Sequence, residues 1–320
     1  MARAVARRAL RAATTLLIAF LVCFFLLQAM PGDPADRLDS PTVPAEQAER
    51  NRRALGLDRP VGAQLVRTLA SYMQGELGAS FTRQRPVAAV LAEALPATLL
   101  LGSAALVLAY GLGLTLAVLL VALPHRWRRI ADRSLLGFAV MPRFWLGVML
   151  ILLLHGLAGW FPASHAAPPG GGGWSDRLLH LVLPALTLGF PAACVVGRYQ
   201  LAVMERLIDN PHVRAARAAG AAGARLLLQH VLRPSLGPAV ALFAIDLPVI
   251  VSGAIVVEVI FAWPGVGRLT ADAVLGSDYP LALAAALLSV TVVLIGRLSA
   301  EAVSGLIHPR VAAARIEGHS

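Results

Sequence analysis

The chain has 320 residues, of which 58% are hydrophobic and 14% are charged, and its net charge at pH 7 is +10. Charged residues make up about 25% of an average soluble domain, so this composition indicates a membrane protein. Every basic residue is Arg, and the absence of Lys excludes a Walker A phosphate loop and a Lys Schiff base in this chain.

Six stretches are each apolar over about 20 residues, the length that crosses a bilayer. They lie at 12–30, 96–123, 134–157, 178–196, 236–261 and 281–307. The first follows four arginines and runs directly into Pro31 without a small-x-small cleavage site, which predicts an uncleaved signal anchor. The loops after the second and fourth stretches are rich in Arg and those after the third and fifth are poor. This alternation predicts an all-α polytopic membrane protein with six transmembrane helices and both termini in the cytoplasm. Because the arginines flank apolar spans, the positive charge favours this topology over nucleic-acid binding.

This topology divides the chain into four parts. Residues 1–30 form a cytoplasmic tail and the first transmembrane helix, and 31–95 form an extracytoplasmic segment with helical pieces at 45–55 and 61–74. Residues 96–307 form the transmembrane core, with a cytoplasmic loop at 198–234, and 308–320 form a cytoplasmic tail. The glycine-rich run at 168–173 is expected to be a flexible external linker.

The cytoplasmic loop contains the polar, Arg-rich stretch 210–233 between two long apolar segments. Asn210 suits a helix N-cap and Pro211 suits the first helical position, where a missing N–H costs nothing. Gly220 suits a helix stop. The pattern predicts a short helix, a glycine turn and a second helix at 224–232. From periodicity alone, the pair is either a docking element or an amphipathic surface helix pair.

Few residues in the spans suggest chemistry. A carboxylate within a membrane helix is costly, so Asp246 is expected either to line a water-filled path or to be satisfied by an Arg or by backbone freed at Pro248. Glu258 either contacts substrate or, as we favour, holds the loop that follows it. Ser252 with His308 suggests an intramembrane serine protease, but Ile250 stands where a strained nucleophile motif has Gly, and a small residue at a helix contact is the better interpretation. The scattered histidines and two cysteines predict no metal site, and we predict no catalytic residue.

The loop resembles the EAA loop of ABC-importer membrane subunits, which runs Glu-Ala-Ala, three residues, Gly, nine residues, Ile, one residue, Leu-Pro. Here the corresponding residues are Arg214, Ala215, Ala216, Gly220, His230, Leu232 and Arg233. The substitutions of Arg for Glu, His for Ile and Arg for Pro are similar to those of the permeases for dipeptides, oligopeptides and nickel. The first permease subunit of that branch also resembles this chain at PGDP (31–34), LGLDRP (55–60), GELGAS (75–80), MPRFWLG (141–147), GWFPAS (159–164), HLVLPALTL (180–188), SGAIVVEVIFAWPGVGR (252–268), DYP (278–280) and HPR (308–310).

The resemblance implies the type I ABC-importer transmembrane-domain fold in the cytoplasmic (inner) membrane. The EAA-type loop would form a coupling helix that docks into a cleft on an ATPase subunit, with ATP and Mg bound by that subunit and no cofactor bound by this chain. Partners would be a second homologous permease in a heterodimer, two ABC ATPase subunits, an extracytoplasmic substrate-binding protein and membrane lipid. Arg214, Ala215, Ala216, Gly220, His230 and Leu232 are the expected coupling residues, and Asp246, Ser252 and Glu258 are candidates for the translocation pathway.

The function expected from the resemblance is the permease subunit of a peptide importer without a nucleotide site or enzymatic activity of its own. One alternative is a nickel importer of the same family, which no His or Cys cluster supports. A second alternative is a secondary transporter, which would show inverted repeats with paired broken helices; none is visible in the sequence.

Overall fold

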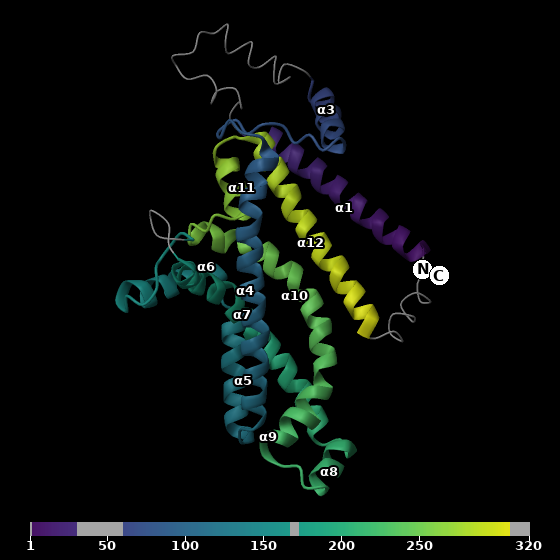
Figure 1. Cartoon of the computed structure of the whole chain (residues 1–320), viewed down its shortest axis with the longest axis vertical. Coiled ribbons are helices and arrows are strands. Elements are labelled where there is room, and N and C mark those ends of the chain that lie inside the picture. Colours follow the sequence, from purple (N-terminus) through teal and green to yellow (C-terminus); the bar gives the residue numbers. More distant parts are fainter. Residues whose placement is uncertain (1, 31–59, 167–172, 308–320) are drawn as a thin grey trace. The chain divides into compact units, whose positions relative to one another are not determined.

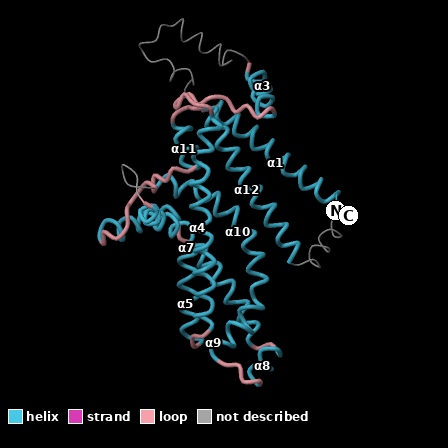
Figure 2. The backbone as a smooth tube through the Cα atoms, in the orientation of Figure 1, coloured by secondary structure: helices cyan, strands magenta, loops and turns pink. Residues whose placement is uncertain are grey.

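The computed structural model describes residues 2–30, 60–166 and 173–307. In those residues the regular structure is helical apart from one isolated bridge between Ala79 and Pro86 (Figures 1 and 2). The helices are α1 (Ala2–Gln28), α3 (Val61–Met73), α4 (Val87–Val121), α5 (His125–Ala139), α6 (Arg143–Leu150), α7 (Trp174–Ile208), α8 (Pro211–Ala218), α9 (Gly223–Arg225), α10 (Arg233–Ile260), α11 (Val266–Leu275) and α12 (Tyr279–Ile307), with π-helical segments η2 (Ile151–Leu157) and η3 (Leu226–Leu232).

Four described helices are long and apolar enough to cross a membrane. They contain the spans Arg8–Gln28, Val87–Val121, Trp174–Ile208 and Tyr279–Ser299, which cover the predicted first, second, fourth and most of the sixth stretches. The predicted fifth stretch lies in α10, a 28-residue helix, although the side chains of 247–253 lie outside the described residues. The all-α membrane fold is therefore confirmed, whereas six crossings and the cytoplasmic termini stay predictions.

The predicted third span is not one straight helix. α5 and the helix formed by α6 and η2 meet at 98°. The break falls at Pro142, whose backbone is extended (φ −60°, ψ 128°). A proline pushes the residue before it out of the helical region, so the sequence explains the position of the break. The predicted helix at 61–74 is confirmed by α3. The predicted helix at 45–55 and nearly all of the predicted linker at 168–173 lie outside the described residues.

By packing, the chain forms two units. The first comprises Met1–Ala97 and Pro264–Thr291, and the second comprises Thr98–Trp263 and Val292–Ser320. The first transmembrane helix thus packs with α3 and with the chain around α11. These units divide the chain differently from the four parts predicted from topology, because topology follows the membrane and packing follows contacts.

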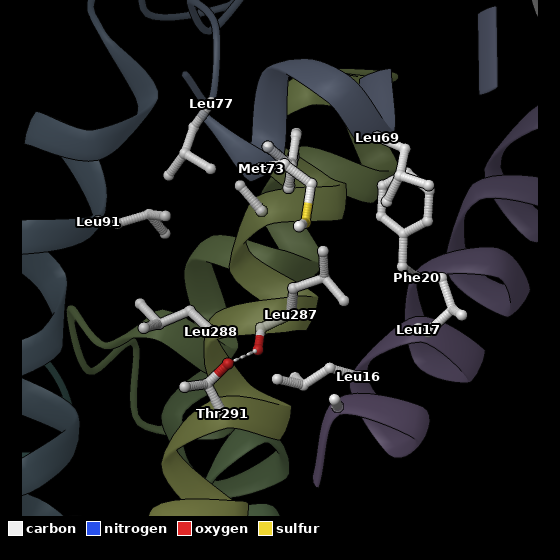
Figure 3. Close-up of a pocket in the computed structure, with 13 residues that line it drawn as sticks. Leu16, Leu17, Phe20, Leu69, Met73, Leu77, Leu91, Leu287, Leu288 and Thr291 are labelled. Carbon is white, nitrogen blue, oxygen red and sulfur yellow. Dashed lines mark hydrogen bonds between the residues drawn. The ribbon is translucent and has the colours of Figure 1, made fainter. Parts of the chain in front are cut away.

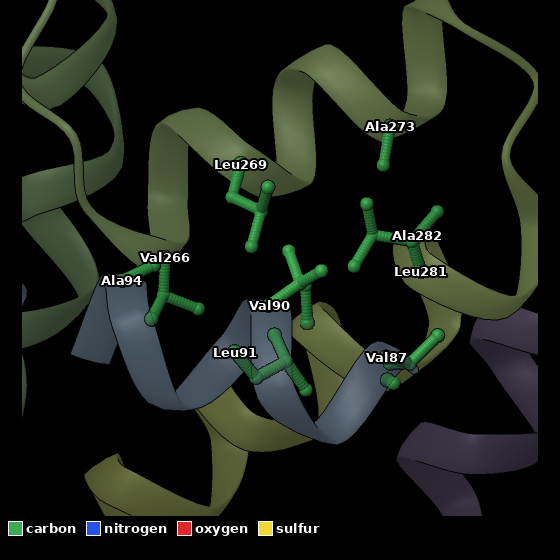
Figure 4. Close-up of a cluster of buried hydrophobic side chains, with 11 residues drawn as sticks. Val87, Val90, Leu91, Ala94, Val266, Leu269, Ala273, Leu281 and Ala282 are labelled. Carbon is green, nitrogen blue, oxygen red and sulfur yellow. The ribbon is translucent and has the colours of Figure 1, made fainter. Parts of the chain in front are cut away.

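The first unit is built around buried aliphatic side chains from three helices (Figure 4). α4 contributes Val87, Val90, Leu91 and Ala94, α11 contributes Val266, Leu269 and Ala273, and α12 contributes Leu281, Ala282, Ala284 and Ala285. A second cluster joins α1 to α12 and α3: Phe20 and Phe24 pack with Leu283, and the rings of Phe20 and Tyr72 are T-shaped with centroids 5.7 Å apart.

Asp278 fixes the start of α12 in this unit. Its carboxylate is fully buried and accepts hydrogen bonds from Ser80 Oγ at 2.5 Å and from the N–H and hydroxyl of Thr82 at 3.0 and 2.7 Å. It also accepts from the N–H of Leu281 at 3.3 Å, as an N-cap carboxylate does. The segment before α4 is therefore bonded to the first turn of α12.

The first unit also contains an apolar groove of about 490 Å³ (Figure 3). α1, α3, the start of α4 and α12 line it with mostly aliphatic side chains, and burial raises the pKa of the Tyr72 phenol at its edge. The hydroxyl of Thr291, the other polar side chain in the lining, donates to the carbonyl of Leu287 at 2.7 Å. The groove therefore lacks the converging polar groups of a substrate site.

In the second unit, α4 and α7 approach so closely that glycine is needed between them. A Cβ on Gly189 would lie 2.6 Å from the carbonyl oxygen of Ala105, and one on Gly113 would lie 2.8 Å from Val196. Two ion pairs then join α5 to α7: Arg198 binds Asp132 through Nε at 2.7 Å and Nη2 at 3.2 Å, and Arg128 binds Glu205 at 2.8 Å. α7 is thus the element against which α4 and α5 are placed.

Candidate functional site

The short helix predicted in the cytoplasmic loop is α8, at the tip of the second unit (Figure 1). Asn210 precedes it with an extended backbone (φ −68°, ψ 150°), and Pro211 takes the first helical position, as predicted. The Asn210 side chain makes no capping hydrogen bond. Instead, the Asn210 carbonyl accepts from the N–H groups of Val213 and Arg214 at 3.0 and 3.1 Å. The predicted position of the N-cap is confirmed. The hydrogen bonds at this position come from the Asn210 carbonyl and not from its side chain.

Gly220 ends α8 as predicted. Its φ is +91°, in the left-handed region that side chains with a Cβ rarely adopt. The N–H of Gly220 donates to the carbonyl of Arg217 at 3.1 Å, and that of Ala221 donates to Ala216 at 3.0 Å. These two bonds form a Schellman motif, which satisfies carbonyls at the end of the helix. The turn therefore depends on the backbone freedom of one glycine.

The predicted second helix at 224–232 is not a separate element. α9 continues through η3 into α10 without a break, because Arg225, Leu232 and Arg233 all keep helical backbone angles. The end of the loop is thus the beginning of the helix that covers the fifth apolar stretch. The loop and α10 therefore share one continuous helix.

α8 is joined to that helix by a hydrogen bond and by apolar packing. Pro234 has no N–H to donate to the carbonyl of His230 four residues before it, and this carbonyl lies 3.1 Å from His212 Nε2. Since a carbonyl only accepts, His212 donates. Val213 of α8 is fully buried, in a cluster formed with Ala117, Leu120, Val121, Leu201, Met204, Leu226 and Val231.

The six residues expected to couple this loop to a partner lie in two environments. Arg214, Ala215 and Gly220 are exposed. Ala216 and Leu232 are half-buried and pack against the cluster that holds Val213. His230, also half-buried, supplies the carbonyl bonded to His212. The loop thus presents a short surface of Arg and Ala on a helix whose opposite side is anchored, an arrangement suited to docking against another protein.

A buried polar contact supports the start of α10. The Gln200 amide in α7 is fully buried and donates to the hydroxyl of Ser235 and, at 3.2 Å, to the carbonyl of Ser235. The Ser235 hydroxyl donates in turn to the carbonyl of Leu232 at 2.6 Å. Gln200 and His212 were not predicted. The signal for Gln200 was an amide within an apolar run, and no pattern in the sequence pointed to His212.

The three candidate pathway residues all lie on α10. Asp246 accepts a hydrogen bond from the Tyr110 hydroxyl at 2.7 Å. Among the described residues its partner is thus a phenol, and not the Arg or the backbone freed at Pro248 that was the alternative to a pathway role. Glu258 is fully buried and accepts from Thr98 at 2.8 Å. Its carbonyl accepts from the N–H of Trp263 at 2.8 Å, which favours a role in holding the following loop. The side chain of Ser252 lies outside the described residues.

These residues do not form one site. Asp246 and Glu258 are twelve residues apart on one helix, about 18 Å at 1.5 Å per residue. Within the described part of the chain, no three His, Cys, Asp or Glu side chains are grouped as metal ligands. The described residues thus provide an exposed face of Arg214 and Ala215 on α8 and, separately, the hydrogen-bonded pair of Asp246 and Tyr110.

Two protein-family models together match nearly the whole chain. Residues 109–313 match the "Binding-protein-dependent transport system inner membrane component" family, and residues 1–102 match the N-terminal region of such membrane components. The chain is 32% identical to the oligopeptide transport system permease protein AppB of Bacillus subtilis over 299 residues, 92% of this chain and 94% of that protein. It is 34% identical to the glutathione transport system permease protein GsiC of Escherichia coli O6:H1 over 288 residues, 89% of this chain and 90% of that protein.

Proposed function

Because the chain belongs to the inner-membrane components of binding-protein-dependent transport systems, we propose that it is the permease subunit that carries di- or oligopeptides through an ATP-driven importer. It is a multi-pass protein of the inner membrane. Support for peptides comes from the two relatives, one named for oligopeptides and one for glutathione, itself a tripeptide. A nickel importer of the same family has no comparable support.

In this proposal, α8 is the helix that docks into a cleft on a separate ATPase subunit. The single observation that carries the assignment is the pairing of an exposed Arg214–Ala215 surface with a fully buried Val213 on the same short helix. The small side chain of the exposed Ala215 permits close approach of the partner surface, and Arg214 would pair with an acidic group on it. The anchored face transmits the displacement to η3 and α10.

ATP and Mg bind to the ATPase subunits, and this chain binds no cofactor and catalyses no reaction. The remaining partners are a second homologous permease, which completes a heterodimer, an extracytoplasmic substrate-binding protein and membrane lipid. The chain has six membrane crossings, with 31–95 outside, 96–307 as the permease core, the coupling loop at 198–234 inside, and the flanking parts 1–30 and 308–320 each carrying a cytoplasmic tail.

The coupling role is tested by Gly220→Val in the complete importer reconstituted in proteoliposomes. A Cβ at this position meets no atom within 4 Å, so the substitution acts through the φ of +91° and not through a clash. We expect normal membrane insertion and loss of transport-linked ATPase activity. Gly62→Val is the control, because Gly62 also has open space around it but lies in α3 without a positive φ. Normal coupled ATPase activity in Gly220→Val would refute the role of the loop.

The partner set is tested by purifying the chain from its native membrane in a gentle detergent, followed by mass spectrometry and an ATPase assay. Recovery of a second permease, of P-loop ATPases and of an extracytoplasmic binding protein is the expected result. A chain that purifies alone, with uptake driven by a proton or sodium gradient without ATP, would establish the secondary transporter instead.

A further inference from the structure

Asp246 occupies an unusual place for a carboxylate. It is the fourteenth of the 28 residues of α10, about 20 Å from either end of that helix. In an inner-membrane component this position is near the middle of the hydrocarbon layer, which is about 30 Å thick. Ionisable groups at such depth face the interior of a helix bundle or a water-filled cavity and are paired there. The partners of Asp246 therefore indicate what it does.

The described residues provide one hydrogen-bond partner for this carboxylate. The Tyr110 hydroxyl in α4 donates to Oδ2 at 2.7 Å, and the Tyr110 ring is held edge-on against Phe243 with centroids 5.1 Å apart. Phe243 lies one turn before Asp246 on α10, so the phenol is fixed from the same helix that carries the acid. Tyr110 thus orients the carboxylate by using one oxygen and leaves Oδ1 open.

Tyr110 does not neutralise the charge, because a phenol donates a hydrogen bond and carries no positive charge. No Arg among the described residues pairs with Asp246. The other acid of α10, Glu258, is fully buried and bonded to Thr98, so it offers no second open carboxylate. An ionised Asp246 therefore has no cation partner among the described residues, and a bound substrate can supply one.

The chemistry of the pair selects the kind of cation. Calcium takes six to eight oxygen ligands and zinc four ligands, whereas this site supplies one carboxylate and one phenol. No group of three His, Cys, Asp or Glu side chains lies close together in the described ranges. A primary ammonium has three donors and forms strong charge-assisted hydrogen bonds with a single carboxylate. The site therefore fits an ammonium better than a metal ion.

We propose that Asp246, positioned by Tyr110, binds the N-terminal ammonium of a peptide as it passes the middle of the membrane. The proposal rests on the proposed function, since it assumes that peptides are the substrates. Asp246 is the binding residue and Tyr110 is a positioning residue. The pair then gives this permease a preference for peptides with a free amino terminus, in addition to any preference of the binding protein.

The test measures uptake of trialanine and of N-acetyl-trialanine by proteoliposomes that hold the complete importer with its binding protein. Each variant is compared with the wild type separately for each peptide, so that discrimination by the binding protein cancels. Asp246→Asn keeps the shape of the side chain and an acceptor for Tyr110 but removes the charge. We expect a loss of about tenfold for trialanine, the size of a charge-assisted hydrogen bond, and a change of less than about twofold for the acetylated peptide.

Two further variants separate binding from structure. Tyr110→Phe removes the orienting hydroxyl, and we expect a smaller loss that again affects trialanine more than N-acetyl-trialanine. Asp272→Asn removes a carboxylate from the exposed pair with Arg268 at 3.7 Å, and we expect uptake of both peptides to stay at the wild-type level. A purely structural role for Tyr110 would lower the uptake of both peptides equally.

Four results would overturn the inference. Equal losses for the two peptides in Asp246→Asn would make the carboxylate structural, and unchanged uptake would remove any role. Loss of the second permease from the purified Asp246→Asn complex would show that the missing cation belongs to that partner. If the wild-type importer transports neither peptide although its ATPase is active, the proposed substrate class fails, and the ammonium site fails with it.

Discussion

Replacement of Gly189 by Ala tests the close contact between α7 and α4. The new Cβ would lie 2.6 Å from the carbonyl oxygen of Ala105 and 3.2 Å from the Cδ2 of Leu108. Ordinary van der Waals contact for a Cβ begins at 3.4 Å, so the two helices must separate locally by about 0.8 Å, the difference between 3.4 and 2.6. The carbonyl belongs to helical backbone and cannot rotate away as a flexible side chain can.

Overpacking of this kind costs about 1–3 kcal/mol, and the better helix propensity of Ala returns up to about 1 kcal/mol. We therefore expect a net loss of about 1–2 kcal/mol, which lowers the thermal midpoint by several degrees. The measurement is thermal unfolding of the purified chain in detergent. The readout is the fraction of protein that remains monodisperse after heating to each temperature.

Gly111→Ala is the matched control, because Gly111 is also a helical glycine, in α4, and its Cβ would meet no atom within 4 Å. Its thermal midpoint should stay the same or rise slightly. If Gly189→Ala is as stable as Gly111→Ala, the close contact between α4 and α7 is wrong, and so is the argument that small residues set their separation.

Three further substitutions test other contacts. Val213→Ala removes two buried methyl groups from the anchored face of α8. We expect the free energy of unfolding to fall by about 2 kcal/mol and the transport-linked ATPase activity to weaken. An unchanged free energy of unfolding would show that α8 is not anchored. Asp278→Asn should lower the unfolding free energy by about 1–3 kcal/mol, because the bonds from Ser80 and Thr82 lose their charge assistance, and an unchanged thermal midpoint would contradict this. Asp132→Asn removes the half-exposed ion pair with Arg198. The free energy of unfolding should therefore fall by about 1 kcal/mol or less, and the loss should shrink at high salt. A loss that does not depend on salt would show that the pair acts by packing.

The fold class was predictable because hydrophobic length is a local property of the chain. Runs of about 20 apolar residues require helices wherever there is no water to satisfy the backbone. The Pro and Gly signals were equally local, and Pro211 and Gly220 have the positions in α8 and its turn that their backbone preferences require. The bend near Pro142 was readable from the proline, but its angle depends on what α5 and α6 pack against.

The candidate coupling loop was predictable in outline and not in its connections. The pattern from Arg214 to Leu232 marked the loop, and the helix–turn arrangement followed from Asn210, Pro211 and Gly220. The continuity of η3 with α10 was missed because a polar, Arg-rich stretch before an apolar run is typical of a loop before a new helix. In the structure that stretch packs on the Val213 cluster and continues into α10.

The sequence by itself determined the class of protein, the approximate positions of the apolar helices and the residues of the loop, because hydropathy and backbone preference act over a few residues. The tertiary structure alone decided which groups meet: Tyr110 with Asp246, Thr98 with Glu258, and Asp278 with Ser80 and Thr82. These pairs are separated by 136, 160, 198 and 196 residues, and no local preference links residues so far apart. Their contact depends on how the helices pack, and that packing gives each buried carboxylate its environment and therefore its role.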